Sequence, residues 1–373
     1  MIIAREIMDG AGRVLLQEGV VLTKGYIRGL EAKGYQHIAI RDANDNAPVP
    51  IDEDVPPGVY AQAVQGLRRV YDDLGEEIRP LQGRTAKEIG NAFDSDSIKA
   101  LTGEGGPLEH VQEVAEQILR HVLTRDTLAG LTSIKGSDSH LFSHSVDVCA
   151  VSIMIGRLLG LGNTQLHQLA AGALLHDIGK LFLTAGVTGA SRVIQHTKLG
   201  YRLLKQSDKR DVLAPHVAYE HHEHQDGSGL PRGLRGSNTI TRDRSKMTPV
   251  PTLIAEIVAV ANAYDNLLSG AETQEAVTTD IALKILARTA GKILNRSIVM
   301  TFLRAVPVYP QGAEVLIQSG KYRGYTAVVG HVHPEALDRP VIVVTKDNKG
   351  KRVEQEQIDL LEDEGIAIRC KSL

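Results

Sequence analysis

The stretch LAAGALLHDIGK, residues 169–180, joins an apolar segment to a His-Asp pair. Apolar residues recur at spacings of three and four over 165–176, which predicts a helix. A histidine and an aspartate at the end of a buried helix are costly unless they are paired or bind a metal ion. We therefore expect His176 and Asp177 to belong to a metal site, with Lys180 one turn further on in the same pocket.

Taken alone, His176 and Asp177 fit a capping aspartate and a hydrogen-bonded core histidine equally well. A second fragment, HHEHQDGSGLP at 221–231, favours the metal site. Adjacent side chains on a regular helix point about 100° apart, so His221 and His222 can reach one ion only where a helix ends. The glycine-containing segment that follows supplies such an irregular backbone.

Isolated histidines and one carboxylate extend the pattern along the chain. His144 and His196 lie in helical surroundings, where a lone histidine is most often a core residue. Asp265 follows the apolar segment 257–264, and a carboxylate on such a helix needs a cationic partner. His140 lies one turn before His144 and is either a further ligand or a histidine hydrogen-bonded to the ligands.

The combination of these residues matters more than any one of them. Imidazoles and carboxylates without a thiolate suit iron, manganese or another divalent ion. The candidate metal ligands are His140, His144, His176, Asp177, His196, His221, His222 and Asp265. We expect Glu223 and Asp226 to orient imidazoles and to cap the loop rather than to bind metal.

Composition restricts the class of protein further. A chain of 373 residues suits two or three domains. The net charge of −3 and the absence of Trp argue against binding to DNA or RNA. Cys149 and Cys370 are far apart and predict free thiols in a reducing cytosol. The N-terminus lacks a signal-peptide pattern and the apolar runs are too short to span a bilayer, so we expect a cytoplasmic location and no membrane contact.

Hydrophobic periodicity predicts a mainly α fold in three parts. Residues 1–105 are expected to form an accessory domain with a small α/β unit, a linker at 42–57 and a helix. Residues 106–308 are expected to form a helical bundle, and 309–373 a small β extension. The predicted helices span 23–34, 59–74, 111–122, 146–159, 165–176, 191–204, 253–268, 281–286 and 298–303, and the predicted strands 14–16, 37–40, 313–317, 327–329 and 341–344.

The chain resembles the HD-GYP subgroup of the HD phosphohydrolase superfamily in the order of its motifs. This order is His144, the HDIGK fragment, His196, the HHEHQDGSGLP fragment and Asp265. The resemblance covers about 111–310 and implies an HD-type bundle around two or three metal ions, usually iron or manganese. It also implies hydrolysis of cyclic di-GMP to pGpG, and in some members onward to GMP. Carried over by position, Asp177 bridges the ions and Lys180 contacts the substrate phosphate.

Three departures separate this chain from the pattern of the subgroup. Leu230 stands where the tyrosine of the GYP signature is expected. The segment SGAETQ at 269–274 replaces an arginine-containing segment that usually follows Asp265. The stretch between Lys180 and His196 is short, so a loop beside the pocket is trimmed. These differences affect substrate contacts more than metal contacts.

The resulting hypothesis is a phosphodiesterase that uses a metal-activated water, with Asp177 and Lys180 as its catalytic residues. One alternative is a hydrolase for a different cyclic dinucleotide or a smaller nucleotide, motivated by Leu230 and the missing arginines. Another is a nucleotide-responsive signalling module with little turnover, motivated by the two flanking units. The expected partner is a cyclic dinucleotide, while a homodimer and signalling protein partners are left open.

Overall fold

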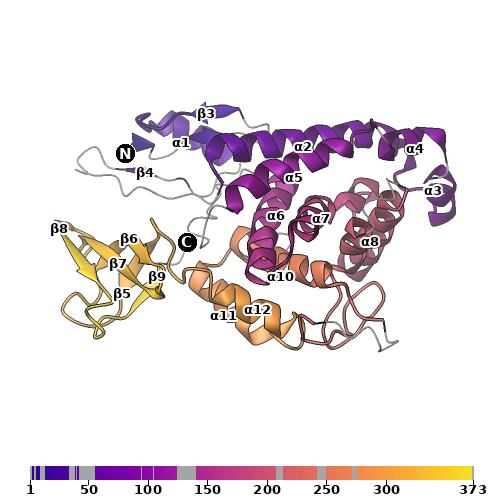
Figure 1. Cartoon of the computed structure of the whole chain (residues 1–373). Helices are drawn as coiled ribbons and strands as arrows, with labels where there is room; N and C mark the ends of the chain where they lie inside the picture. The colour runs from indigo at the N-terminus through magenta and orange to yellow at the C-terminus, as the bar shows by residue number, and fades with distance from the viewer. Residues whose placement is uncertain are drawn as a thin grey trace.

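The computed structural model shows a helical body flanked in sequence by two small β-containing units (Figure 1). The residues it describes are 2–3, 6–8, 13–32, 38, 40–41, 55–93, 95–103, 105–123, 140–206, 213–241, 249–270 and 275–371. The expected mainly α architecture, with its small terminal β unit, is confirmed.

The N-terminal unit contains two strand pairs and one helix. They are β1 (Ile2–Ile3) with β4 (Ile40–Arg41), β2 (Ile7–Met8) with β3 (Val14–Leu16), and α1 (Lys24–Ala32). The Thr23 hydroxyl oxygen accepts a hydrogen bond from the backbone N–H of Tyr26 at 3.2 Å and so caps the start of α1. The expected linker at 42–57 lies mostly outside the described residues.

The helical body contains most of the described chain. Its helices are α2 (Pro57–Ile78), η1 (Arg79–Leu81), α3 (Ala86–Phe93), α4 (Asp96–Thr102), α5 (Glu109–Val122), α6 (His140–Leu158), α7 (Asn163–Leu175), η3 (Ile178–Phe182), α8 (Gly189–Leu204), α9 (Ala214–Glu220), α10 (Leu253–Ser269), α11 (Thr279–Thr289) and α12 (Arg296–Leu303). The helices expected from periodicity are all present. Three short helices, α3, α4 and α9, were not predicted, because seven or eight residues give little periodic signal.

The expected helical bundle is interrupted between α9 and α10, where the described residues form turns and irregular backbone. No helix was predicted there, and an irregular backbone was expected after His222. Side-chain hydrogen bonds, rather than helical ones, hold this segment in place, as the site geometry below shows.

Within the described residues, the body has one hydrophobic core cluster, whose buried side chains come from residues between Val55 and Val306. Helix α2 buries Leu67, Tyr71 and Leu74 in it, packing against α5 and α6. Helix α2 therefore shares the core of the helices that carry the candidate ligands. The expected domain boundary at 105/106 stays a prediction.

The C-terminal unit is an antiparallel sheet with strand order β8-β7-β6-β5-β9. The strands are β5 (Glu314–Ile317), β6 (Thr326–His333), β7 (Ala336–Lys346), β8 (Arg352–Asp359) and β9 (Ile368–Cys370). The three predicted strands match β5, β6 and β7. Strand β8 was missed because it is an edge strand with mostly exposed, charged residues and little apolar alternation.

A search of the described residues for helices that could cross a membrane finds one candidate, the stretch Leu141–Leu158 of α6. Its length and composition pass the test, but 78% of the stretch is buried inside the fold. Core helices pass the same test, and this one carries His144 toward the ligand cluster.

Candidate metal centre

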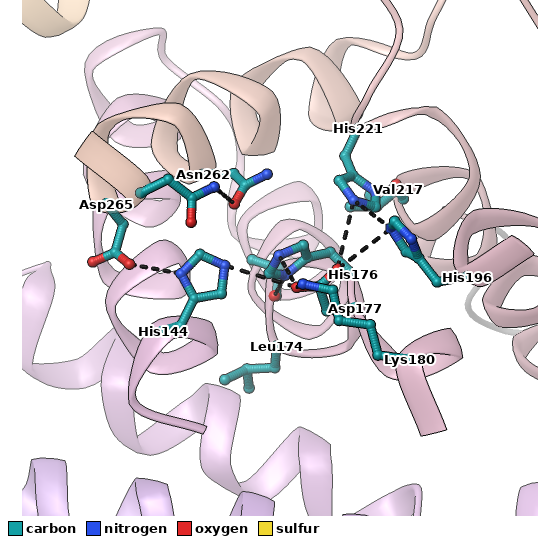
Figure 2. Close-up of polar contacts among 12 residues, drawn as sticks. His144, Leu174, His176, Asp177, Lys180, His196, Val217, His221, Asn262 and Asp265 are labelled. Carbon is teal, nitrogen blue, oxygen red and sulfur yellow. Dashed lines mark hydrogen bonds and ion pairs between the residues drawn. The ribbon is translucent and has the colours of Figure 1, made fainter. Parts of the chain in front are cut away.

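Five helical segments bring the predicted ligands together in the middle of the body (Figure 2). The buried side chains come from α6 (His144), the junction of α7 and η3 (His176 and Asp177), α8 (His196), the end of α9 (His221) and α10 (Asp265). Each is at most 6% exposed. Residues spread over about a third of the sequence thus converge on one buried site.

The Asp177 carboxylate occupies the centre of this arrangement (Figure 2). Its Oδ2 lies 3.4 Å from Nε2 of His176 and 3.8 Å from Nε2 of His144. Its Oδ1 lies 3.5 Å from Nε2 of His196 and 3.8 Å from Nε2 of His221. One carboxylate therefore faces two pairs of imidazoles, each through a different oxygen.

Backbone geometry explains how this convergence is reached. Helix α7 ends at Leu175, so His176 and Asp177 leave the helical path and turn toward α8. Gly179 makes the approach possible, because a Cβ there would overlap the carbonyl oxygen of His196 and lie 2.6 Å from the backbone nitrogen of Gly200. A larger residue at 179 would push the turn away from His196.

Three imidazoles are oriented by backbone carbonyls of their own segments. The Nδ1 atoms lie 2.7 Å from the Ala173 oxygen for His176, 2.8 Å from the Arg192 oxygen for His196, and 3.0 Å from the Val217 oxygen for His221. A carbonyl only accepts, so each Nδ1 carries a proton, and in the neutral ring each Nε2 then presents its lone pair toward Asp177. This is the tautomer that binds a metal ion through Nε2.

His144 is held differently, by a carboxylate. Its Nδ1 lies 2.6 Å from Oδ2 of Asp265, while its Nε2 faces Asp177. A carboxylate on the far nitrogen of an imidazole is a common way to orient a metal-binding histidine. Here Asp265 contacts His144 from the side away from Asp177, and its predicted role as a direct ligand stays a prediction.

Two groups of ligand atoms are close enough to hold a metal ion. The aspartate group consists of His144, His176 and Asp177, and the histidine group of His196, His221 and His222. Within each group the ligand atoms lie within 4.8 Å of one another. His221 follows the last residue of α9, so the neighbouring histidines do sit where a helix ends.

Two buried atoms at the junction of the groups lack hydrogen-bond partners among the described residues: Oδ1 of Asp177 and Nε2 of His176. Buried polar atoms are nearly always satisfied by protein, water or an ion. Both are strong ligands for divalent cations. The residues present therefore fit a divalent metal centre.

The protonation states of Asp177 and of the histidine group also suit metal binding. Burial alone would raise the pKa of Asp177, but the charges of Lys180 and then His176 outweigh it and hold this pKa well below its ordinary value. Burial lowers the pKa values of His196 and His221, and together with the neighbouring His196 it lowers that of His222 to about 3. An ionised carboxylate and neutral imidazoles are the forms that bind metal.

Lys180 lies where it was expected, beside Asp177. Its Nζ is 2.6 Å from Oδ2 of Asp177, and its side chain is 20% exposed. It is therefore a partly exposed cation beside a buried carboxylate. His140 is the first residue of α6, but its side chain lies outside the described residues, so its predicted role as a ligand stays a prediction.

Glu223 holds the loop that follows the histidine pair. Its two oxygens accept hydrogen bonds from the backbone N–H groups of Arg232 at 2.7 Å and Leu234 at 2.6 Å. Asp226 caps the start of the same loop by accepting from the Ser228 backbone N–H at 2.9 Å. Both carboxylates therefore cap the loop as expected, while these contacts reach backbone rather than the predicted imidazoles.

A buried polar network behind this loop was missed from the sequence. Glu256 of α10 accepts hydrogen bonds from the side-chain amides of Gln225 and Asn295, both at 2.8 Å. Gln225 also accepts from the backbone N–H of Asn238 at 2.9 Å. The signal was available, because Glu256 is a carboxylate in an apolar helix, as Asp265 is.

Comparison with known proteins agrees with the geometry. The HD domain family matches residues 141–267. A cyclic di-GMP phosphodiesterase of Pseudomonas aeruginosa is 28% identical over 260 residues, covering 67% of this chain and 58% of that protein. The cyclic di-GMP phosphodiesterase response regulator RpfG of Xanthomonas campestris is 31% identical over 250 residues, covering 63% and 61%.

A 3'3'-cGAMP-specific phosphodiesterase of Vibrio cholerae is 26% identical over 176 residues, covering 45% of this chain and 35% of that protein. The chain spans 58% and 61% of the length of the first two relatives. The matched region contains every candidate ligand except His140, together with Lys180 and the loop at 227–231. Residues 141–267 thus match the HD domain family, and the central helical region is similar to cyclic di-GMP phosphodiesterases, as the sequence predicted.

Proposed function

We propose that this protein is a metal-dependent phosphodiesterase that hydrolyses cyclic di-GMP to pGpG, with onward cleavage to GMP as a second step of the same chemistry. The observation that carries the proposal is the buried Asp177 carboxylate, which faces two groups of imidazoles and has one oxygen without a hydrogen-bond partner among the described residues. The resemblance of the region to cyclic di-GMP phosphodiesterases supports the reaction class.

The proposed metal ligands are His144, His176 and Asp265 on one side of Asp177, and His196, His221 and His222 on the other, with His140 as a further candidate. We propose iron or manganese, because the donors are imidazoles and carboxylates without a thiolate. Bound divalent ions would supply an acidified water and would neutralise charge on the phosphate.

The chain's own residues would then orient the metal ligands and stabilise the charge that develops on the phosphate. Asp177 stays ionised across the neutral range because its pKa is held low by Lys180 and His176. Lys180 can hold a phosphate oxygen, because its partly exposed amine already pairs with a carboxylate oxygen. The buried imidazoles are held in place through their Nδ1 hydrogen bonds, so little reorganisation is needed when charge develops on the phosphate.

A second candidate is a hydrolase that prefers a different cyclic dinucleotide. Leu230 has no hydroxyl where the subgroup has tyrosine, and its backbone N–H is committed to the carbonyl of His222 at 3.0 Å. The similarity to a protein named as specific for 3'3'-cGAMP makes that nucleotide the first competitor to test.

The test is a nucleotide panel on metal-loaded protein. Protein stripped with a chelator and reloaded with Mn²⁺ or Fe²⁺ is incubated with cyclic di-GMP, 3'3'-cGAMP and pGpG, and products are separated by chromatography. We expect cyclic di-GMP to be cleaved, and cleavage to vanish in stripped protein. Preferential turnover of 3'3'-cGAMP would select the second candidate, and no turnover of any cyclic dinucleotide would reject both.

A matched pair of variants ties the activity to the site. His176→Ala removes a buried imidazole that faces Asp177, whereas His224→Ala removes one whose Nδ1 contacts the Ser228 hydroxyl at 2.9 Å in the loop. Only the first is expected to lose metal and turnover.

A further inference from the structure

Helix α2 lies outside the region matched by the HD domain family, yet it contacts the segments that carry the metal ligands. Figure 1 shows α2 as a long helix that runs along the helical body, and it packs against α5, α6 and η3. Its buried face includes Tyr71, which is 2% exposed. This side chain reaches the end of α7, directly before His176 and Asp177.

Tyr71 touches two ligand-bearing segments at once. Its hydroxyl donates a hydrogen bond to the carbonyl oxygen of Leu174 at 3.4 Å, and Leu174 lies two residues before His176. Its ring meets the edge of the Phe142 ring, with centroids 5.5 Å apart, and Phe142 lies two residues before His144. One tyrosine therefore contacts both of the segments that carry the imidazoles of the aspartate group.

The Leu174 carbonyl needs such a donor. The last four carbonyls of an α-helix have no partner within the helix, and Leu174 belongs to the last turn of α7. The preceding carbonyl, that of Ala173, lies 2.7 Å from Nδ1 of His176. Two successive carbonyls at this helix end are thus capped by side chains, one from His176 itself and one from Tyr71.

The electrostatic setting keeps Tyr71 in the donor form. Burial, and next the negative charge of Asp177, raise its pKa above the ordinary value. The phenol therefore stays protonated at neutral pH, and its hydrogen remains available to a carbonyl. A buried carbonyl that lost this donor would be left unsatisfied, which is costly.

We propose that Tyr71 is a positioning residue of the metal centre: its hydroxyl fixes the end of α7, and with it the direction in which His176 and Asp177 present their ligand atoms. The proposal rests on the metal centre of the proposed function, but not on which nucleotide is hydrolysed. Tyr71 acts through the backbone and does not contact the ions or the substrate.

Tyr71→Phe tests this with the smallest change, because the ring contact with Phe142 is kept and only the hydroxyl is lost. We expect Mn²⁺ to bind about 10–100-fold more weakly, as for other groups that orient ligands. At saturating Mn²⁺, kcat should fall while KM stays near the wild-type value. The visible absorption spectrum of Co²⁺-loaded protein should change, since it reports ligand geometry.

Tyr309→Phe is the matched control. Its hydroxyl also donates to a backbone carbonyl, that of Ile368 at 2.8 Å, but in the C-terminal sheet. It should lower the unfolding midpoint by a similar amount and leave Mn²⁺ affinity and the Co²⁺ spectrum unchanged. The midpoints, followed by circular dichroism, show that both variants are folded when metal is added.

The proposal is overturned if Tyr71→Phe loses stability as the control does but binds Mn²⁺ like the wild type with an unchanged Co²⁺ spectrum. The hydroxyl would then contribute to folding stability and not to the geometry of the metal ligands. Failure of the proposed function looks different, because the wild type itself would then bind metal without cleaving any cyclic dinucleotide.

Discussion

The two ligand groups around Asp177 are built in different ways. The aspartate group contains a carboxylate of its own, and its His144 is paired with a second one, Asp265, at 2.6 Å. The histidine group contains three imidazoles and no carboxylate, and His196 and His221 are oriented by backbone carbonyls. The histidine group therefore depends on Asp177 for negative charge, whereas the aspartate group has that charge built in.

This difference has consequences for the strength of each site. Neutral imidazoles attract a divalent cation less strongly than a carboxylate does, and they lose the cation to protons as the pH falls. His222 is also the one partly exposed member of either group. The histidine group should be the weaker and more acid-sensitive half of the centre, and the shared carboxylate should be the residue that both halves need.

The largest effect is expected for Asp177→Asn, which keeps the shape of the side chain and removes its charge. Both groups should lose metal, and turnover of cyclic di-GMP should fall by at least about 10³-fold, since losing even one stabilising donor costs about 10²–10³. Metal content and turnover are measured on the same preparation. Full retention of one ion per chain would show that the groups do not share this carboxylate.

A pair of variants addresses the groups one at a time. Asp265→Asn should weaken metal binding at the aspartate group about 10–100-fold, because it removes the charge that orients His144. His222→Ala should instead release the ion of the histidine group. Titration of stripped protein with Mn²⁺ distinguishes two binding steps. If both variants weaken the same step, the assignment of residues to groups is wrong.

Acid should destabilise the metal-free protein. The pKa values of His196, His221 and His222 are lowered in the fold from an ordinary value of 6.5, so the unfolded chain takes up more protons as the pH drops. Stability is therefore full above about pH 7 and declines below about 6.5, and His222, whose pKa is lowered to about 3, contributes about 2 kcal/mol of the loss at pH 5. The low pKa of Asp177 acts in the same direction at lower pH.

Urea unfolding in the presence of a chelator at pH 7 and pH 5 measures this dependence. His222→Ala should show a shallower loss, because one of the three groups is gone. An equal loss in both proteins would mean that His222 titrates normally.

The smallest effect on metal binding is expected for Leu230→Tyr, which restores the residue typical of the subgroup. Leu230 sits in a loop fixed by Glu223, whose oxygens bond the backbone at Arg232 and Leu234, so the loop path should survive the change. Mn²⁺ affinity should stay within about 3-fold, since the substitution removes no ligand or orienting group. The ratio of cyclic di-GMP to 3'3'-cGAMP turnover is the sensitive measurement. No change in that ratio would mean that position 230 does not contribute to substrate preference.

Most of the fold was accessible from pattern alone. Long apolar periodicities predicted α5, α6, α7, α8 and α10, because each buries a wide stripe of side chains in one core. The short helices and the edge strand β8 gave too little signal. The path of the irregular segment between α9 and α10 could not be predicted, because side chains distant in sequence, such as Glu256 and Asn295, hold it in place.

The sequence by itself determined the chemistry of this protein: the ligand types, their order along the chain and the HD domain that contains them. Residue identity decides which donors exist, and the spacing of His176 and Asp177 at a helix end already implies a buried polar site. Only the tertiary structure decided how those donors are divided between the two ligand groups. Nothing local to Asp177 reveals that its oxygens face separate groups, that Asp265 meets the far nitrogen of His144, or that Tyr71 of α2 caps the end of α7. Those relations depend on how helices remote in sequence pack, and packing is set by the whole core.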